Sequence, residues 1–287
     1  MRGVPFIFVF WGGVAVGQAW TQLPDFPGTP RDDAAQFSRG TSIYVGTGYE
    51  VGWVLTNDWY RFNIAINTWD TIPAMPAAPR QYATAFVVGN FGYVFGGLGS
   101  GGPLGDLWHF NPILNIWIQE SSLPDAPRYA ACSFTSGNWG FVTTGMLDGG
   151  SPTNTTWAYD AASDTWAPRA AFPGVPRHRA MSFGIDGLVY VTGGADSAFN
   201  ALADGWVYDP GVDLWSPIAP IPQPRYGADG IGVGQKGYVI GGASSASVFH
   251  DDVWRYDPVT DAWSTLDAFG GGPRRGGVIG GYGSPIN

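Results

Sequence analysis

The sequence predicts an all-β protein made of six similar units arranged around one axis. Two markers repeat with the same period along the 287-residue chain. A tryptophan returns at intervals of 48 or 49 residues, at Trp20, Trp69, Trp117, Trp166, Trp215 and Trp263. A Pro-Arg pair follows each tryptophan by ten or eleven residues, with its arginine at Arg31, Arg80, Arg128, Arg177, Arg225 and Arg274. A fixed period near 50 residues is typical of repeat architectures rather than of a single ordinary core.

The segment between Arg80 and Trp117 shows what one unit contains. It holds four short runs rich in aromatic and β-branched residues, YATAFVVGN, FGYVFGG, DLWHFNP and NIWIQE. Such runs, ended by glycines or by an Asn-Pro pair, are typical of strands, and no helical period interrupts them. Four short strands in a unit of 48 or 49 residues predict one blade of a β-propeller.

Further markers lie at fixed places within the units. Small-residue pairs such as Gly96-Gly97, Gly193-Gly194 and Gly241-Gly242 end one strand, and Phe-Asn or Tyr-Asp pairs follow. A second tryptophan series precedes the first, at Trp59, Trp108, Trp157, Trp206 and Trp254. With the first tryptophan series, these motifs resemble the kelch repeat over roughly residues 20 to 281. The resemblance implies a six-bladed kelch β-propeller whose twisted four-stranded sheets surround a channel.

The two ends of the chain each hold part of a sixth unit. Five units are complete, and what remains is Trp20 with its strand at the start and Arg274 with RGGVIGGYGS at the end. We therefore expect a sixth blade built from both termini, which removes exposed sheet edges. When Arg274 is aligned with Arg80, Asn287 lies opposite Tyr93, at the start of the second strand. The sixth blade is therefore expected to be incomplete, within a single propeller domain over residues 20–287.

The repeated residues are expected to have structural roles. The tryptophans should pack between neighbouring blades, where each buried aromatic contributes roughly 4–6 kcal/mol as an upper bound. The glycine pairs should allow sharp turns or close backbone approach. The Pro-Arg arginines should hydrogen-bond to the backbone within or between blades.

The N-terminus and the composition predict an exported protein. Arg2 precedes the largely apolar VPFIFVFWGGVAV, and Gly17-Gln18-Ala19 offers a cleavage site, so residues 1–19 read as a signal peptide. Thirteen apolar residues are too few for a transmembrane span. The formal charge is −9 with a single lysine, Lys236, so nucleic-acid partners are not expected. We expect a secreted or periplasmic monomer, in which the only cysteine, Cys132, is buried.

The loops between the second and third strands vary most between units, and they emerge on the same face as the blade-to-blade connections. They cover residues 49–57, 98–105, 146–155, 195–205 and 243–252. Loops of this kind carry binding sites on rigid scaffolds, so this loop face is the expected ligand surface. The residues directly after each Pro-Arg should ring the channel mouth there, and kelch domains that bind peptides use polar residues at these positions.

The expected ligand is a glycan or a peptide or protein segment, bound without a cofactor or a metal. Tyrosine rings stack on sugars or peptide planes, and arginine forks suit carboxylates. The main binding residues are expected to be Tyr82, Tyr129, Tyr226, Arg179 and Arg275. Gln81 and His178 should assist them, and Asp33 lies at the same mouth.

Enzymatic and structural alternatives remain open at this point. The copper-radical oxidases among kelch proteins need a Tyr–Cys cross-link and two histidine ligands, whereas His109, His178 and His250 occupy different repeat phases. The segment 171–194 resembles the periplasmic sialic-acid mutarotases, although the long insertions of those enzymes are missing. Mutarotation needs an acid and a base beside a sugar ring, which His178 or Asp33 with Arg179 or Arg275 would supply. A purely structural envelope protein would instead show a lateral apolar patch and no pocket.

Overall fold

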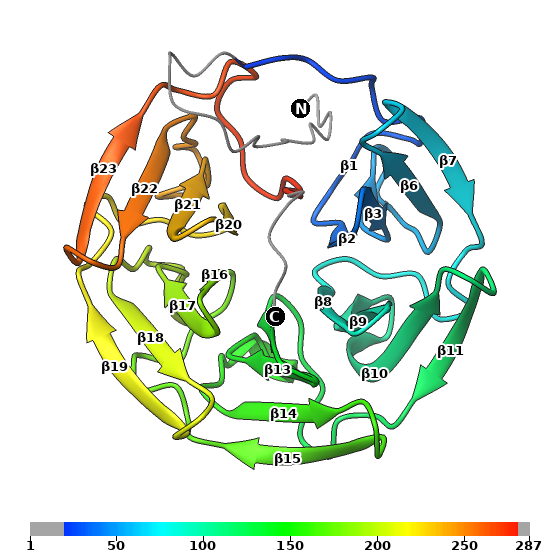
Figure 1. The fold of residues 1–287 in the computed structure, drawn as a ribbon, viewed down its shortest axis with the longest axis horizontal. Coiled ribbons are helices and arrows are strands. Elements are labelled where there is room, and N and C mark those ends of the chain that lie inside the picture. Colours follow the sequence, from blue (N-terminus) through cyan, green and yellow to red (C-terminus); the bar gives the residue numbers. More distant parts are fainter. Residues whose placement is uncertain (1–19, 281–287) are drawn as a thin grey trace.

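The computed structural model describes residues 20–280, so the signal peptide expected over residues 1–19 lies outside the described residues. Five four-stranded antiparallel sheets surround a central channel (Figure 1). Each of these sheets is a meander in which every strand pairs with the next strand of the same blade, and only the first of these blades has two further short strands, β4 (Tyr49–Glu50) and β5 (Val54–Leu55), between its second and third strands. The blades contain, in chain order, β2 (Ala35–Arg39), β3 (Ser42–Gly46), β6 (Trp59–Asn63) and β7 (Thr68–Ile72); β8 (Thr84–Val88), β9 (Phe91–Gly99), β10 (Gly102–Asn111) and β11 (Ile116–Glu120); β12 (Cys132–Ser136), β13 (Trp139–Thr143), β14 (Thr156–Asp160) and β15 (Thr165–Arg169); β16 (Met181–Ile185), β17 (Leu188–Thr192), β18 (Gly205–Asp209) and β19 (Leu214–Ile218); and β20 (Asp229–Val233), β21 (Lys236–Ile240), β22 (Val253–Asp257) and β23 (Ala262–Leu266).

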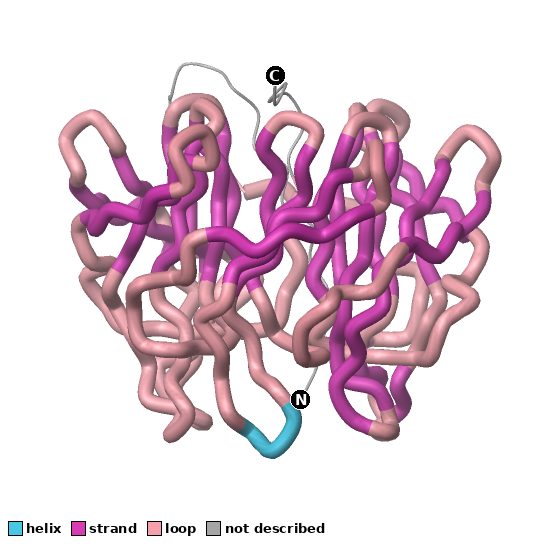
Figure 2. Tube along the Cα trace, turned by 90° about the horizontal axis from the view of Figure 1, so that it is seen from below, coloured by secondary structure: helices cyan, strands magenta, loops and turns pink. Residues whose placement is uncertain are grey.

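The loops between second and third strands gather at one end of the propeller (Figure 2). That end also holds a 3₁₀ turn over Asp148–Gly150 and a small sheet of β1 (Arg31–Asp32), β4 (Tyr49–Glu50) and β5 (Val54–Leu55). Two of the expected loops contain more regular structure than predicted. Residues 49–57 include β4 and β5, and residues 98–105 continue β9 and β10 up to a register shift between Leu104 and Leu107.

The first tryptophan series joins neighbouring blades, as predicted. Five of the six, from Trp69 to Trp263, lie on the fourth strand of a blade, and each donates its indole N–H to a backbone carbonyl of the preceding unit, 2.8–3.0 Å away. Trp69 reaches Pro24 in this way, which ties the N-terminal segment to the first blade. The pairs are Trp69 with Pro24, Trp117 with Pro73, Trp166 with Ser121, Trp215 with Ala170 and Trp263 with Ala219.

The Pro-Arg arginines bond to backbone carbonyls, as expected, but they also bind aspartates that the sequence analysis did not assign to them. Arg177 is fully buried and donates to the carbonyl of Gly193 at 2.8 Å and to both oxygens of Asp204 at 2.8 and 2.7 Å. The indole N–H of Trp206 donates to the same carboxylate at 2.9 Å. Arg80 and Arg225 repeat the arrangement with Asp106 and Asp252. In these three pairs the arginine side chain is buried and the aspartate side chain is partly exposed, and each pair helps to fix the start of its blade.

Trp59 departs from the second tryptophan series by one residue. In the register of the strands, Tyr60 occupies the place that Trp206 has in β18, and Trp59 points to the opposite face. Trp59 is completely buried, and its ring lies where a Cβ on Gly46 would be, 2.1 Å from the nearest ring carbon. The sequence pattern therefore grouped Trp59 with the wrong residues, since alternate strand positions face opposite sides.

The sixth position is incomplete in the described part of the chain, as the sequence predicted. Residues 20–30 and 269–280 run through it without forming a strand (Figure 1). They nevertheless close the core, because Phe26 and Val278 pack with the first blade and Phe269 and Ile279 pack with the fifth. The kelch propeller fold predicted from the sequence is thereby confirmed.

Candidate functional site

A closed ring of backbone hydrogen bonds defines the mouth of the channel. Its six members each follow a Pro-Arg arginine by two residues, and each donates its N–H to the carbonyl of the member before it at 2.8–3.1 Å. All six have left-handed backbones, with φ between 51° and 65°. Such a conformation is uncommon for residues other than glycine and costs energy that the surrounding structure must support. The members are Asp33, Tyr82, Ala130, Arg179, Gly227 and Gly276.

Small residues widen the channel directly inside this ring. The next position is alanine in five units and glycine in the sixth, at Ala34, Ala83, Ala131, Ala180, Ala228 and Gly277. The second glycine of a Gly-Gly pair packs against this alanine, and a Cβ on Gly194 would lie 3.0 Å from the Cβ of Ala180. The glycine pairs therefore allow close backbone approach, as predicted.

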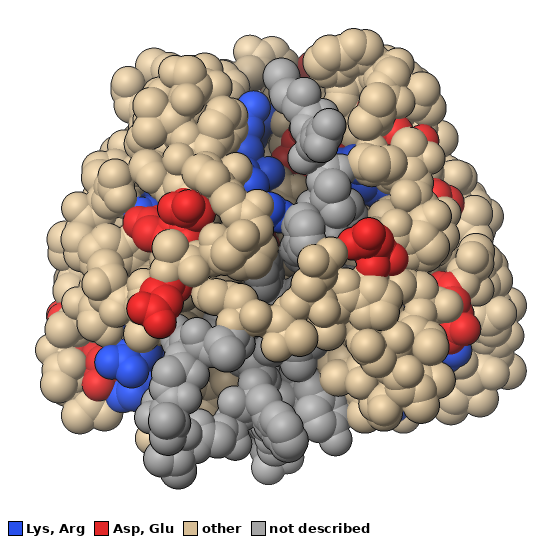
Figure 3. Space-filling model, turned by 90° about the horizontal axis from the view of Figure 1, so that it is seen from above, with Lys and Arg blue, Asp and Glu red and all other residues tan. Residues whose placement is uncertain are grey.

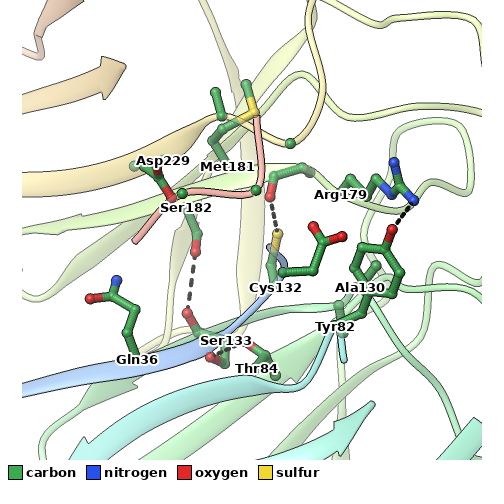
Figure 4. A pocket seen from close by; sticks show the side chains of 18 of the residues that line it. Gln36, Tyr82, Thr84, Ala130, Cys132, Ser133, Arg179, Met181, Ser182 and Asp229 are labelled. Atoms are coloured by element: carbon green, nitrogen blue, oxygen red, sulfur yellow. Dashed lines mark hydrogen bonds between the residues drawn. The ribbon is translucent and has the colours of Figure 1, made fainter. Parts of the chain in front are cut away.

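The ring and the inner strands enclose a cavity of about 200 Å³ (Figure 4). Its wall carries one polar side chain from each of the five blades, together with Cys132 and Met181; the polar residues are Gln36, Thr84, Ser133, Ser182 and Asp229. The serine and threonine hydroxyls hold neighbouring blades together, since Ser133 contacts the Thr84 hydroxyl at 2.5 Å and Ser182 donates to the Ser133 carbonyl at 3.2 Å. The hydroxyl groups are therefore already hydrogen-bonded within the protein, and the side chains available to bind a ligand are the amide of Gln36 and the charged groups.

Arg179 spans the mouth on a platform of aromatic rings. Its guanidinium carbon lies 4.6 Å from the ring centre of Tyr82, and its Nη2 donates to the Tyr82 hydroxyl at 2.6 Å (Figure 4). The rings of Phe199 and Tyr226 lie at 5.9 and 6.0 Å. Arg179 is half-buried and, within residues 20–280, makes no ion pair closer than 4 Å. Its charge is therefore oriented without being neutralised by a direct carboxylate contact.

Arg275, two units further on at the sixth position, also lies beside two aromatic rings. Its guanidinium carbon lies 6.0 Å from the ring of Tyr226 and 5.6 Å from the ring of Phe249. The side chain of Arg275 is exposed. Tyr226 therefore lies between two guanidinium groups, and each group has an exposed loop phenylalanine on its outer side.

The sequence analysis missed Phe199 and Phe249, which lie in the variable loops at 51% and 38% exposure. Phe199 has a left-handed backbone with φ of 60°, which is unusual for a bulky residue. Asp196 holds it there, because its carboxylate accepts from the N–H groups of Ala198 and Asn200 at 2.9 Å. The signal available from the sequence was the single phenylalanine in each of the variable loops 195–205 and 243–252.

The remaining predicted residues are placed unequally. Tyr82 and Asp33 line the cavity with Arg179, whereas Tyr129 and Gln81 are half-buried in single β-bridges beside it. The Tyr129 ring lies 5.9 Å from that of Tyr82. Tyr226 is buried and presents its ring only through the two arginines. The structure thus places these side chains around one mouth, and their binding of a ligand stays a prediction.

His178 is buried and packs edge-on against Phe199, with ring centres 4.8 Å apart. Burial, and secondarily the Arg179 charge, lower the pKa of His178 to about 4. It is therefore neutral at physiological pH, and its role in this structure is to support the Phe199 loop. His109 contacts Glu120 at 2.5 Å on the outer strands of the second blade, away from the channel mouth.

Two carboxyl groups in the cavity have raised pKa values. Burial raises the pKa of Asp33 to about 6, with a further contribution from Asp32, while Arg179 and Tyr82 oppose the shift. Burial raises the pKa of Asp229 to about 7, with Arg274 opposing and Asp33 adding to the shift. Asp229 was not predicted as a site residue, because it begins a strand and lies beyond the residues that directly follow the Pro-Arg pair.

The described part of the chain shows no metal centre and no membrane-spanning helix. In residues 20–280, no three histidine, cysteine, aspartate or glutamate side chains gather closely enough to hold a metal ion. None of the helices found there is long and apolar enough to cross a membrane. Cys132 is buried, and burial raises the pKa of its thiol to about 11, so it is not an activated nucleophile.

A propeller with a polar channel mouth is the class of protein that these features define. Residues 16–174, more than half of the chain, match the KLHDC2/KLHL20/DRC7 Kelch-repeats domain. Residues 176–222 and 224–267 match the Kelch motif. The chain therefore belongs to the kelch-repeat family.

The fold is also similar to a solved structure described as "Structure of YjhT". The TM-score is 0.75 at 17% identity, and the match covers 88% of this chain and 89% of that chain. No curated protein sequence matches. Since 693 chains of solved structures share the fold, its shape alone does not select a ligand.

Proposed function

We propose that this protein is a monomeric binding module that captures a carboxylate-bearing glycan or peptide at the channel mouth. The observation that supports this most is the alternation of aromatic and guanidinium groups, in which Tyr226 lies between Arg179 and Arg275. Guanidinium groups hold carboxylates through paired, charge-assisted hydrogen bonds. Aromatic rings beside them offer flat apolar surface to a sugar ring or a peptide plane.

The mouth is also pre-organised for binding. Arg179 belongs to the closed hydrogen-bonded ring, Tyr226 and Arg275 directly precede ring members in the sequence, and the Phe199 loop is fixed by the Asp196 carboxylate. A rigid site loses less conformational entropy when a ligand binds, which favours affinity.

Figure 3 shows basic side chains, in blue, along a hollow on the side of the sixth position, while acidic side chains are scattered over the surrounding surface.

Matched ligands with and without a carboxylate test this function. We expect glucuronate or a peptide with an acidic side chain to bind more tightly than glucose or the amidated peptide, measured by calorimetry. Arg275→Gln should weaken the acidic ligand by about tenfold, because a hydrogen bond to a charged group contributes about 1.5–3 kcal/mol. Equal affinity for the acidic and neutral members of each pair would contradict the proposal.

A sugar isomerase is the second candidate, and a specific observation favours it. Asp33 and Asp229 both line the cavity with pKa values of about 6 and 7, close to those that general acid–base catalysis needs. An enzyme of the mutarotase type would use one as acid and the other as base. Accelerated anomer exchange in NMR spectra, lost in Asp229→Asn, would establish this reaction, and unchanged exchange for a set of common sugars would remove it.

We also propose that the protein acts outside the cytoplasm, in the periplasm or the medium. The support is the apolar N-terminal stretch and the small-residue site before Trp20. N-terminal sequencing of the protein from an expression host should find Trp20 as the first residue. A retained Met1 in a cytoplasmic fraction would contradict export.

A further inference from the structure

Asp229 is the only charged residue at its place in the repeat. It follows a Pro-Arg arginine by four residues, and the equivalent residues are Ala35, Thr84, Cys132, Met181 and Val278. Asp229 lines the cavity below the mouth (Figure 4). Within residues 20–280, no group donates a hydrogen bond to its carboxyl, and the only nearby cation that favours its charged form is Arg274.

The backbone around Asp229 holds its carboxyl group in the channel. β20 lies directly against β16, because Gly230 and Gly232 have no side chains. A Cβ on these residues would lie 2.6 and 1.9 Å from the carbonyl oxygens of Ser182 and Gly184. On the other side, a Cβ on Gly277 would lie 2.6 Å from the Oδ2 atom of Asp229. The carboxyl therefore lies against the backbone at Gly277 and lines the cavity.

The channel therefore separates its charges along the axis. Arg179 and Arg275 lie at the mouth with Asp32 and Asp33, whereas Asp229 lies two strand residues further in, roughly 6–7 Å deeper. A carboxylate removed from water is costly unless a cation or several donors compensate it. Titratable groups whose pKa is shifted by burial in a cavity are often found at functional sites. A cation carried by the ligand would supply what Asp229 lacks.

We infer that Asp229 is a second ligand-binding group, which takes the protonated amine of a zwitterionic ligand whose carboxylate is bound at the mouth. The inference rests on the proposed capture of a carboxylate by Arg179 and Arg275. The amine and the carboxylate must be several bonds apart, because the two sites lie at different depths. The cavity has a volume of about 200 Å³, which leaves space for a short chain between the two groups.

A series of ω-amino acids tests the inference. Glycine, β-alanine, 4-aminobutyrate and 6-aminohexanoate would be titrated by calorimetry or NMR at pH 7.5, with butyrate and butylamine as single-charge controls. We expect an intermediate chain length to bind best, and 4-aminobutyrate to bind at least about tenfold more tightly than butyrate. Asp229→Asn should remove this difference and leave the butyrate affinity unchanged. Equal affinities for 4-aminobutyrate and butyrate in the unaltered protein would overturn the inference.

Matched controls separate the failure of this inference from failure of the proposed function. Asp70→Asn removes the same charge on an outer strand, where Asp70 pairs with Arg61, and should keep the preference for 4-aminobutyrate. Binding of butyrate without an amine preference would support the mouth and contradict the role of Asp229. Binding of butylamine alone, lost in Asp229→Asn, would contradict the mouth as an anion site. Thermal unfolding of each variant shows that the fold is retained.

Discussion

Arg177 and Arg179 are two residues apart and use the same side chain in opposite ways. Arg177 is fully buried, and both its terminal nitrogens bond to Asp204. Arg179 is half-buried and rests on the Tyr82 ring, with the tyrosine hydroxyl as its acceptor. The first arginine recurs in every unit, whereas the second position holds Asp, Tyr, Ala, Arg and Gly in different units. A buried pair fixed by the repeat is structural, and a variable charge on a fixed ring is available for a ligand.

The largest expected effect is on stability, from the structural arginine. Arg177→Ala removes the hydrogen bonds that the buried guanidinium donates to the partly exposed Asp204 and should lower the free energy of unfolding by about 1.5–3 kcal/mol. Arg179→Ala should change it by less than about 1 kcal/mol, because Arg179 has no direct carboxylate partner among residues 20–280. Urea denaturation followed by tryptophan fluorescence measures both. Equal losses in the two variants would erase the distinction.

The next effect is on ligand affinity, where substitution of Arg179 should matter more than substitution of Arg177. Arg179→Gln should weaken a carboxylate ligand by about 10- to 100-fold, since a hydrogen bond to a charged group contributes about 1.5–3 kcal/mol. The unfolding midpoint should stay close to that of the unaltered protein. Arg61→Gln, which lies on an outer strand beside Asp70, provides the control for loss of a positive charge. If Arg61→Gln weakened the ligand equally, net charge rather than the mouth would explain the binding.

The two kinds of aspartate should respond to pH in opposite directions. The pKa of Asp204 is lowered by hydrogen bonds from Arg177 and Trp206, which outweigh its burial, so its stabilisation is present above pH 3.8 and is lost as pH falls through the folded-state pKa. The pKa of Asp229 is raised to about 7 by burial, so its ionisation destabilises the fold as pH rises from about 4 to 7.

Denaturation at pH 5 and pH 8 tests this difference in sign. The stability of Asp229→Asn relative to the unaltered protein should increase from pH 5 to pH 8. Asp204→Asn should be less stable than the unaltered protein at both pH values. Arg274 and Asp33 face Asp229 and also titrate or carry charge, so the comparison is made within one variant across pH. A constant difference between Asp229→Asn and the unaltered protein would contradict the raised pKa.

The smallest effect is expected at the loop aromatics. Phe199→Ala removes one ring beside the Arg179 guanidinium and should weaken the ligand about two- to fivefold, in line with about 0.5–1 kcal/mol for an exposed cation–π contact. Val259→Ala, on an exposed turn of the fifth blade, should leave affinity unchanged. A loss in Phe199→Ala no greater than in Val259→Ala would show that the loop does not take part.

The repeat predicted the blades because its markers have direct physical roles. The tryptophans hydrogen-bond to the preceding unit, and the glycines leave space for an alanine of the same blade. Because each unit needs these contacts, the same residue types return with each period. The aspartates that pair with the Pro-Arg arginines were not predicted. Asp204, for example, lies 27 residues after Arg177 in the sequence, and only the folded blade brings the two together. Trp59 was misassigned because one shifted residue reverses the face of a strand.

The candidate site was predictable in position but not in detail. Counting two residues from Arg177 or Arg80 leads to Arg179 and Tyr82, whose contact joins residues 97 apart in the sequence. The burial of His178 and the raised pKa of Asp229 depend on neighbours from other blades and leave no local signal. Exposed rings such as Phe199 could have been noted from the variable loops alone.

The most direct test of the account follows the arginine Nε–H signals by NMR during a titration with butyrate. The account predicts that the signals of Arg179 and Arg275 shift together with one dissociation constant, while those of Arg177 and Arg225 stay in place because Asp204 and Asp252 already occupy them. Shifts at neither mouth arginine, or shifts spread equally over the buried arginines, would contradict the claim that the channel mouth captures a carboxylate.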